Sequence, residues 1–276
     1  MLKNKLSDIV LCAFDIETSG GYPLESEVCE IAAVKWHNGK IIESYQTLIK
    51  PEKKMSDFII SIHGITNEMV ANAPKIQDKI AEFHQFVQNT ICVAHHAPFD
   101  LGFLSIEYEK KGLMPPPNPV LCTSLLARKL FPESTNHKLQ TLVEFFKFEK
   151  NTAHRAYDDA ISCLNVALKC LEKIGWDKNL EDAIKTQERT ILWQNFYLQE
   201  LKRNPAILSL MQAIQENKKA RIIYKKNSTS KLDEVIIPHG LVRSPDGDFL
   251  FAYSDIEKKV RRFYLDRILE SEVLSS

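Results

Sequence analysis

The stretch Ala13-Phe14-Asp15-Ile16-Glu17-Thr18 ends an apolar run that begins at Val10. Such a run predicts a buried strand, and because side chains alternate along a strand, Asp15 and Glu17 point to the same face. Two buried carboxylates on one face repel each other unless a positive charge lies between them. A divalent metal ion, which prefers oxygen ligands, would supply that charge. Taken alone, the pair also fits two solvated acids at the end of a strand, and motifs later in the chain decide between the two interpretations.

The composition is that of a globular protein. The chain has 276 residues, 44% of them hydrophobic and 26% charged, which suits one large domain or one medium and one small domain. No apolar run approaches the ~20 residues that a membrane span needs. The first residues lack the long apolar core of a signal peptide, so we expect a cytoplasmic protein with no membrane partner. None of the six cysteines lies in a C-x-x-C pair, which favours reduced cysteines.

The net charge of zero conceals an asymmetry between the two ends of the chain. Residues 201–276 hold 14 Lys and Arg against 10 Asp and Glu, and the preceding residues hold 22 against 26. An acidic front part is unusual for a nucleic-acid-binding protein unless its acids hold metal ions. The basic tail would attract phosphates, although a solvated surface explains it equally well.

Strand and helix signals alternate through the first part of the chain. Residues 9–50 predict three strands, and Asn38-Gly39 predicts an antiparallel hairpin between the last two. Short strands at 91–94 and 120–122 then alternate with helical patterns that reach residue 174. This alternation predicts an α/β fold with a mixed sheet, whose ligands gather at strand ends and helix starts.

The pattern changes towards the C-terminus. Residues 176–204 are helical in pattern and rich in Gln, Glu and Lys, which predicts a helical linker. Beyond it, one helix at 207–215 precedes several short strands, which predict a small, strongly bent sheet or barrel. We therefore expect one domain at 1–175 and a second at 205–276, joined by the linker 176–204.

Two more acids converge on the first pair. Asp100 begins a helix just after the strand at 91–94, and Asp159 lies in the first turns of a helix, five residues after His154. Four carboxylates in one cleft require cations, and two divalent ions about 4 Å apart would form a clamp for in-line attack at phosphorus. His154 is the natural base to take a proton from water, because the unperturbed pKa of histidine lies near the working pH.

These residues lie in three segments that resemble the motifs of the DnaQ-like DEDDh 3′→5′ exonucleases, namely FDIET at 14–18, HHAPFD at 95–100 and HRAYDD at 154–159. The resemblance covers about residues 8–172. It implies a ribonuclease H-like fold with a five-stranded mixed sheet flanked by helices, and two Mg²⁺ or Mn²⁺ ions. It also implies stepwise removal of 3′-terminal nucleotides as monophosphates. By position, the metal ligands are Asp15, Glu17, Asp100 and Asp159, and the general base is His154.

The match departs from the family pattern at two points. His96 stands where the second motif usually has asparagine, which puts one local hydrogen bond in doubt but not the metal site. The doublet Asp158-Asp159 leaves two candidate ligands, and the H-x-x-x-x-D spacing selects Asp159. Neighbouring residues on a helix point about 100° apart, so the two cannot both be primary ligands.

Four further side chains are candidates for contact with the substrate: Thr18, His63, Phe103 and Tyr157. Thr18 would lie beside the terminal nucleotide. His63 belongs to the SIHGIT segment at 61–66, which resembles a loop of the proofreading branch, and it equally fits a residue that stabilises the loop. Phe103 fits either the helix core or a base-stacking surface, and Tyr157 either contacts substrate or covers the helix start.

The tail carries a second resemblance, to the WYL domain, through the segments at 237–255 and 260–269. Of the name-giving Trp-Tyr-Leu only Leu250 is kept. The resemblance implies an SH3- or Sm-like β fold that binds nucleic acid or a small ligand and regulates an attached domain. Cationic and aromatic side chains that could bind single-stranded nucleic acid are present at Arg243, Tyr253, Arg262 and Arg267. The alternative is an internal Asp266–Arg267 ion pair in a docking module.

The main hypothesis is a metal-dependent 3′→5′ exonuclease acting on DNA 3′ ends, with single strands preferred and the C-terminal domain guiding or regulating binding. An RNA 3′ exonuclease is the second hypothesis, because the same catalytic residues serve both sugars. A third is a nucleic-acid-binding or ligand-binding regulator with a silent nuclease domain. The SIHGIT loop favours association with a polymerase, whereas the folded tail favours a free-standing repair or processing nuclease.

Overall fold

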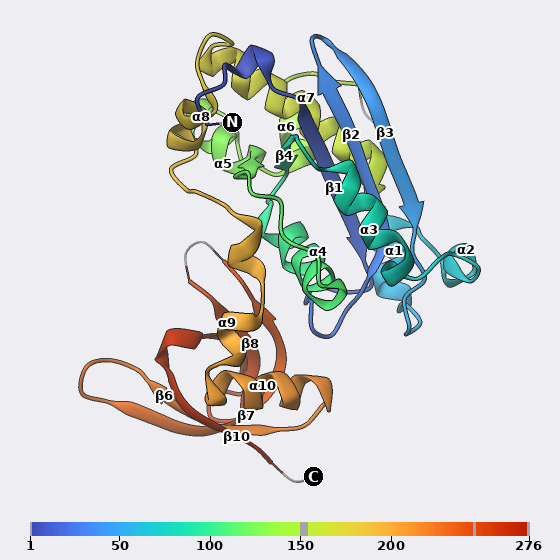
Figure 1. The fold of residues 1–276 in the computed structure, drawn as a ribbon. Coiled ribbons are helices and arrows are strands. Elements are labelled where there is room, and N and C mark those ends of the chain that lie inside the picture. The colour runs from blue at the N-terminus through green and yellow to red at the C-terminus, as the bar shows by residue number, and fades with distance from the viewer. Residues whose placement is uncertain (1, 150–153, 245–246, 275–276) are drawn as a thin grey trace. The chain divides into compact units, whose positions relative to one another are not determined.

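The structure is a computed structural model that describes residues 2–149, 154–244 and 247–274 (Figure 1). Its contacts divide the chain into two compact units. The first holds the residues up to Ser19 together with Val28–Asn195, and the second holds Gly20–Glu27 together with the chain from Phe196 onward. The second unit therefore includes a short segment from the N-terminal part of the sequence.

A five-stranded sheet in the order β3-β2-β1-β4-β5 forms the centre of the first unit. Its strands are β1 (Leu11–Thr18), β2 (Val28–His37), β3 (Lys40–Leu48), β4 (Ile91–Ala94) and β5 (Leu121–Cys122). β1 pairs with β2 in antiparallel and with β4 in parallel fashion, so the sheet is mixed. This arrangement confirms the predicted α/β fold. The hairpin between β2 and β3 is also confirmed, with Asn38 and Gly39 both at positive φ, as a tight two-residue hairpin turn requires.

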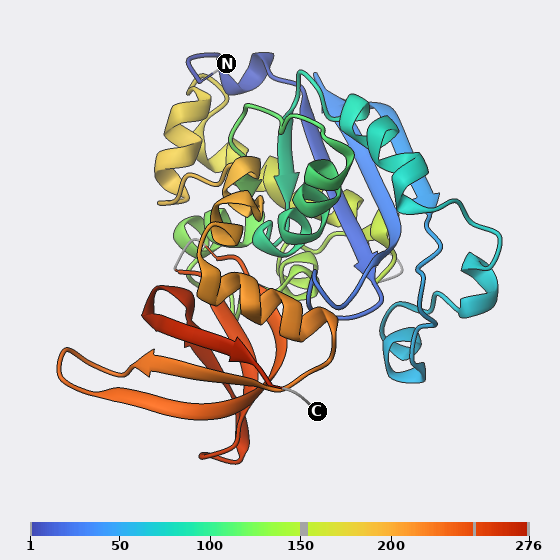
Figure 2. The ribbon, with the colours of Figure 1, turned by 60° about the horizontal axis from the view of Figure 1, so that its bottom comes forward.

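Helices cover both faces of this sheet (Figures 1 and 2). Their bounds, including one 3₁₀ turn, are η1 (Leu6–Asp8), α1 (Asp57–His63), α2 (Asn67–Val70), α3 (Ile76–Phe86), α4 (Pro98–Lys111), α5 (Thr123–Leu130), α6 (Leu139–Phe145), α7 (Ala156–Ile174) and α8 (Leu180–Thr186). Leu11 and Ala13 of β1 belong to the core that α7 shares, whereas Phe14 packs on Phe83 of α3. The strand alternation thus assigns the odd-numbered side chains of β1 to the α7 face.

Residues 176–204, predicted as a linker, contain three short helical segments and not one helix: α8, η2 (Trp193–Phe196) and α9 (Gln199–Lys202). Trp193 is fully buried and stacks on Phe14 and Tyr108, with ring centroids 5.6 and 5.2 Å away. An aromatic side chain in the centre of a core ties its segment to that core. The contact division accordingly falls between Asn195 and Phe196.

The second unit is built on an antiparallel sheet in the order β10-β6-β7-β8-β9, with α10 (Pro205–Gln215) packed against it (Figure 2). The strands are β6 (Ala220–Lys225), β7 (Lys231–Val242), β8 (Phe249–Ser254), β9 (Lys259–Tyr264) and β10 (Ile268–Val273), with a 3₁₀ turn η3 (Leu265–Arg267) before the last. This confirms the predicted C-terminal β domain. β10 is an addition to the strands expected from the sequence.

Within the second unit, the segment Gly20–Glu27 packs on β7 and β8. The rings of Tyr22 and Phe251 lie 5.5 Å apart. A Cβ added at Gly240 would lie 2.3 Å from Cγ of Tyr22, closer than real contacts allow. β7 also has a register shift between Pro238 and Gly240, a bulge that bends a strand. Gly240 is therefore the position that admits the Tyr22 ring.

Candidate active site

The sheet brings two acids of β1 onto the face covered by α7. Asp15 and Glu17 follow Leu11 and Ala13 in the same alternation, so they continue the α7 face where the core ends. Asp159 lies on the first turn of α7 and is buried. One ligand oxygen from each of Asp15, Glu17 and Asp159 lies within 4.8 Å of the others. The structure thus brings together three of the four predicted metal ligands in one cluster.

The fourth acid, Asp100, reaches β1 from the first turn of α4. It is 2% exposed, and its Oδ1 accepts a hydrogen bond of 3.2 Å from the backbone N–H of Ile16. Ile16 lies between Asp15 and Glu17 in the sequence, so this bond attaches the start of α4 to the acidic end of the strand. β1 also changes register between Glu17 and Thr18, and such bulges often occur beside active sites.

Asp159 is the member of the doublet that enters the cluster, whereas Asp158 does not. Its two oxygens accept hydrogen bonds, one of 2.9 Å from the backbone N–H of His154 and one of 3.1 Å from Nε2 of Gln140. The bond from His154 closes a short loop over the first turn of α7. The carboxylate is therefore held in place before any ion binds.

Burial and mutual repulsion make the charged form of these acids costly. Burial raises the pKa of Glu17 to about 8, and the carboxylates of Asp159, Glu30 and Asp100 add to this rise. Burial likewise raises the pKa of Asp15 well above its ordinary value, with Asp100 and Glu17 as the largest charged contributors. The pKa of Asp100 and that of Asp159 are also raised by burial. A site of this kind favours a cation, because a positive charge would restore the ionised carboxylates.

The chemistry of the donor atoms fits hard divalent cations. All the side chains that converge here offer carboxylate oxygens, the ligands that Mg²⁺ and Mn²⁺ prefer over sulfur or imidazole. Asp15, Glu17, Asp100 and Asp159 would hold such ions.

His154 lies at the entrance to α7. Its backbone adopts φ of +60°, in the left-handed region, and it precedes Arg155, the N-cap residue of α7. The residue is exposed, while its N–H is tied to Asp159. A left-handed non-glycine residue beside buried acids marks a backbone constraint of the kind that clusters at functional sites.

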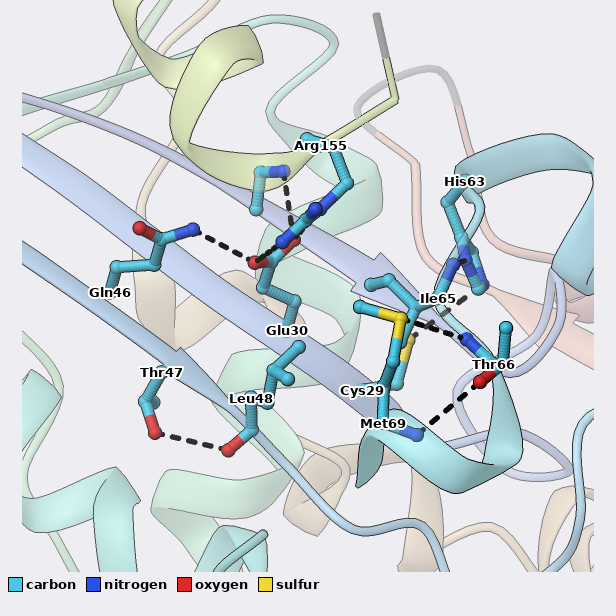
Figure 3. A network of polar contacts seen from close by, with 11 residues as sticks. Cys29, Glu30, Gln46, Thr47, Leu48, His63, Ile65, Thr66, Met69 and Arg155 are labelled. Carbon is cyan, nitrogen blue, oxygen red and sulfur yellow. Dashed lines mark hydrogen bonds and ion pairs between the residues drawn. The ribbon is translucent and has the colours of Figure 1, made fainter. Parts of the chain in front are cut away.

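The predicted substrate residues occupy different environments. Thr18 ends β1 and is 8% exposed, next to the acidic cluster. His63 is 4% exposed, and its Nδ1 accepts a hydrogen bond of 3.0 Å from the N–H of Ile65, while its Nε2 lies 3.8 Å from Sγ of Cys29 (Figure 3). His63 therefore stabilises its own loop, as the structural alternative expects. Tyr157 is partly buried against the α7 core.

Phe103 and Phe99 differ in exposure. Phe103 is 3% exposed and has no free face for a nucleobase, in agreement with the helix-core alternative. Phe99, one residue before Asp100, is 36% exposed, and its ring lies 5.2 Å from that of Phe103. Of these two rings, Phe99 is the one with exposed surface, and it belongs to the HHAPFD motif.

A network missed from the sequence lies beside the cluster (Figure 3). Glu30 of β2 is directly opposite Glu17 in the antiparallel register, and it is fully buried. Its carboxylate binds Arg155, Gln46 and the N–H of Ala156. The signal was a single acid in the apolar strand sequence VCEIAAV, together with an arginine inside the HRAYDD motif.

The candidate residues of the second unit also lie in different environments. Arg243 is 14% exposed, pairs with Asp248 at 2.9 Å and donates to the backbone oxygen of Tyr197 at 2.6 Å, which are internal contacts. Arg262 is exposed and lies 4.8 Å from the ring centroid of Phe249. Arg267 lies 5.5 Å from the ring centroid of Tyr264. Tyr253 lies on β8 and is partly exposed.

A cavity of about 710 Å³ lies in the second unit. Arg267 and Tyr264 line it together with Asp248, Asp266 and Ile207. Positively charged, negatively charged and aromatic side chains thus line one concave surface.

Among the residues that the structure describes, no helix is long and apolar enough to span a membrane.

Comparison with known proteins gives two family matches. The model of the family described as "Exonuclease" (RNase_T) matches residues 12–167, and that of the WYL domain matches residues 205–273. Both matches confirm the resemblances drawn from the motifs.

Curated relatives match over part of the chain. The "DNA polymerase III PolC-type" of Halalkalibacterium halodurans is 39% identical over 155 residues, which are 56% of this chain and 11% of that protein. The protein of the same name from Bacillus subtilis is 37% identical over 168 residues, which are 60% of this chain and 12% of that protein. The chain thus spans about a tenth of the length of these relatives.

Solved structures share the fold. The nuclease domain of 3′hExo, a DEDDh family member, in complex with rAMP has a TM-score of 0.54 at 18% identity, covering 62% of this chain and 96% of that one. E. coli Exonuclease I in complex with a dA16 oligonucleotide has a TM-score of 0.53 at 16% identity, covering 89% of this chain and 55% of that one.

Proposed function

Because the chain belongs to the exonuclease family and carries a WYL domain at residues 205–273, we propose that it is a metal-dependent 3′→5′ exonuclease acting on DNA. It would release nucleoside monophosphates from 3′ ends, with single strands preferred. The observation that supports the proposal most directly is the cluster of Asp15, Glu17 and Asp159, whose oxygens lie within 4.8 Å of one another. No such cluster is needed for a stable core, since buried like charges oppose folding.

Each residue has a distinct part in the proposed reaction. When bound, divalent ions would stabilise the attacking oxygen of water and the leaving oxygen of the phosphodiester, and the four carboxylates would provide their ligands. His154 would accept the proton of the attacking water, because it is exposed beside the acids and its backbone is tied to Asp159. Phe99 would stack on the base next to the scissile bond, and Thr18 would contact the terminal nucleotide.

The choice of DNA rests on the relatives. Curated relatives of this chain are named as DNA polymerases, and the similarity to two of them extends over 155 and 168 of its residues. RNA is the second candidate substrate, because the catalytic residues act on either sugar and only a contact to the 2′-OH distinguishes them. Both a proofreading role with a polymerase and a role in repair or processing are compatible with this chemistry, and we favour the latter.

The C-terminal domain would guide or regulate nucleic-acid binding. Arg262 lies over the Phe249 ring on an exposed strand. Arg267 and Tyr264 line the cavity of the second unit. Both places therefore combine cationic and aromatic groups, which suit the binding of single-stranded nucleic acid. Arg243 has a structural role through Asp248 and is not included. A regulator with a silent nuclease domain is the less favoured function, because the acidic set and His154 are complete.

The proposal is tested with labelled oligonucleotides. The pure protein is incubated with 3′- and 5′-labelled single-stranded DNA and RNA of one sequence, in Mg²⁺, Mn²⁺ or EDTA. We expect a ladder that shortens from the 3′ end, depends on the metal and forms faster on DNA. Faster degradation of RNA would select the second candidate substrate. Absence of cleavage on every strand, with the acids intact, would contradict the proposed activity and support the regulator.

A further inference from the structure

Glu30 carries an unusually complete set of hydrogen bonds. Its Oε1 accepts from Nη2 of Arg155 at 2.9 Å and from Nε2 of Gln46 at 2.9 Å. Its Oε2 accepts from Nε of Arg155 at 3.2 Å and from the backbone N–H of Ala156 at 3.1 Å. The side chain is 1% exposed, so both oxygens are satisfied wholly by the protein (Figure 3). A buried carboxylate with this many donors is fixed in position.

These bonds join β2 to the beginning of α7. Arg155 is the N-cap residue of α7, and its own side chain makes no capping hydrogen bond. The first N–H of the helix is satisfied instead by Glu30, from another element. Arg155 directly follows His154, and its backbone oxygen accepts from the N–H of Asp159 at 2.9 Å. A contact that fixes Arg155 therefore also fixes its neighbour His154 and the first turn that carries Asp159.

The register of the sheet places this attachment beside the metal ligands. Glu30 is opposite Glu17, and residues opposite each other on antiparallel strands have their side chains on the same face. Glu30 thus joins α7 to β2 at the same level at which Glu17 and Asp159 approach each other. The Arg155 guanidinium also supplies a permanent positive charge at this level, because arginine stays protonated.

We infer that Glu30 and Arg155 form a positioning pair, which holds the entrance of α7 so that His154 and Asp159 meet the acids of β1. This inference rests on the proposed function and adds two residues to its machinery. Neither touches the reacting atoms. Removal of the pair is expected to lower the turnover number through displacement of His154 and Asp159, and to leave substrate affinity nearly unchanged.

The variants separate geometry from charge. Glu30→Gln keeps the size of the side chain but presents an amide to donors, and Arg155→Lys keeps the positive charge but loses the two-pronged hydrogen bonding. Glu43→Gln is the matched control, because it breaks an exposed ion pair of 2.7 Å with Lys35 on β2 and β3, away from α7. All assays are run well below the melting temperature of each variant.

Three quantities are measured for each variant: kcat and KM on labelled single-stranded DNA, the affinity for Mn²⁺, and hydrogen exchange of the Ala156 amide. We expect kcat to fall about 10–100-fold in Glu30→Gln and Arg155→Lys, the usual range for residues that orient metal ligands, with KM within about threefold. Exchange at Ala156 should accelerate and Mn²⁺ affinity should weaken. Glu43→Gln should match the wild type throughout.

The outcomes distinguish this inference from the proposed function. If Glu30→Gln and Arg155→Lys keep wild-type kcat and Mn²⁺ affinity, the pair has only a structural role and the inference is wrong. If Arg155→Lys alone keeps full activity, charge and not geometry is what matters, which also contradicts positioning. If the wild type cleaves no substrate, the proposed function fails. Amide exchange and Mn²⁺ affinity then still decide whether the pair orders the acids.

Discussion

Glu17 and Glu30 are paired directly across β1 and β2, yet their pKa values move in opposite directions. Burial raises the pKa of Glu17 to about 8. Burial acts on Glu30 in the same direction, but hydrogen bonds from Arg155, Gln46 and Ala156 outweigh it and hold the pKa below its ordinary value. Glu30 therefore has its counterion within the protein, whereas Glu17 needs one from outside. The contrast distinguishes an acid that is paired within the protein from a proposed metal ligand.

Asp15→Asn should abolish hydrolysis and also stabilise the metal-free protein. The partly buried Asp15 repels Asp100 and Glu17, and an amide removes that charge at nearly constant volume. We expect the free energy of unfolding in EDTA, measured by denaturant titration, to rise by about 1 kcal/mol or more. Asp8→Asn, an exposed acid in η1, is the control and should change neither quantity. A destabilised Asp15→Asn protein would argue against repulsion in the cluster.

Metal addition should stabilise the first unit. Ions that bind only the folded acids add about 2.7 kcal/mol at a hundredfold excess over Kd. We therefore expect Mn²⁺ to raise the melting temperature of the wild type, measured by calorimetry against EDTA. This rise in melting temperature should be absent in Asp159→Asn, because the substitution removes one negatively charged carboxylate from the cluster. An equal rise in both proteins would place the ions elsewhere.

The proposed metal ligands could be predicted from the sequence because their positions follow from local rules. Asp15 and Glu17 share a face through strand alternation, and Asp100 and Asp159 each lie in the first turn of a helix. Glu30 was not accessible in this way. Its importance depends on which residue of β1 it opposes and on the approach of Arg155 from 125 residues away, and neither is encoded in a local pattern.

The exposure of individual side chains and the short elements α1 and β10 also could not be predicted from the sequence. Phe99 and Phe103 lie four residues apart on α4 with their rings in contact, yet Phe99 is 36% exposed and Phe103 is 3% exposed, a difference that helical spacing does not predict. α1 lacks a strong apolar period but is stabilised by its Ser56 cap and by Gly64 in the left-handed region. β10 contains three polar residues among its six and is fixed by pairing with β6.

Phe99→Ala should weaken substrate binding, whereas Phe103→Ala should destabilise the fold. Phe99 is 36% exposed, so its loss should raise KM for single-stranded DNA, since stacking on one base contributes about 1–3 kcal/mol. Phe103 is buried, so its loss should lower the free energy of unfolding by about 3–5 kcal/mol. Steady-state kinetics and urea titration measure the two effects. An unchanged KM in Phe99→Ala would exclude the stacking role.

Gly240→Ala should destabilise the second unit, and Tyr22→Gly, which removes both clashing carbon atoms, should offset this loss. The added Cβ would lie 2.3 Å from Cγ and 2.4 Å from Cβ of Tyr22, so either the ring or the bulge in β7 must move. Overpacking of this kind costs about 1–3 kcal/mol. A double-mutant cycle in urea should give a coupling energy of comparable size. Additive effects would show that the ring moves away freely.

His95 should make the stability of the first unit depend on pH. Its Nε2 lies 3.0 Å from the backbone oxygen of His137 and its Nδ1 lies 2.8 Å from Oγ1 of Thr123. A carbonyl oxygen only accepts a hydrogen bond, so Nε2 of His95 carries a hydrogen. Burial is the main cause of the lowered pKa of His95, which falls to about 4. The hydrogen bond to the backbone of His137 opposes this effect, whereas the charges of His96, Arg128 and His137 add to it.

The direction follows from proton binding. Between the ordinary value of 6.5 and about 4, the unfolded chain binds a proton that the folded chain does not, so stability falls as the pH falls through this window. The difference corresponds to roughly 3 kcal/mol. Urea titrations between pH 7 and pH 4 should show a shallower decline in His95→Gln than in the wild type. His37→Gln, which removes a histidine elsewhere in the same unit, should retain the wild-type slope, and parallel slopes for all three proteins would show that His95 does not control the decline.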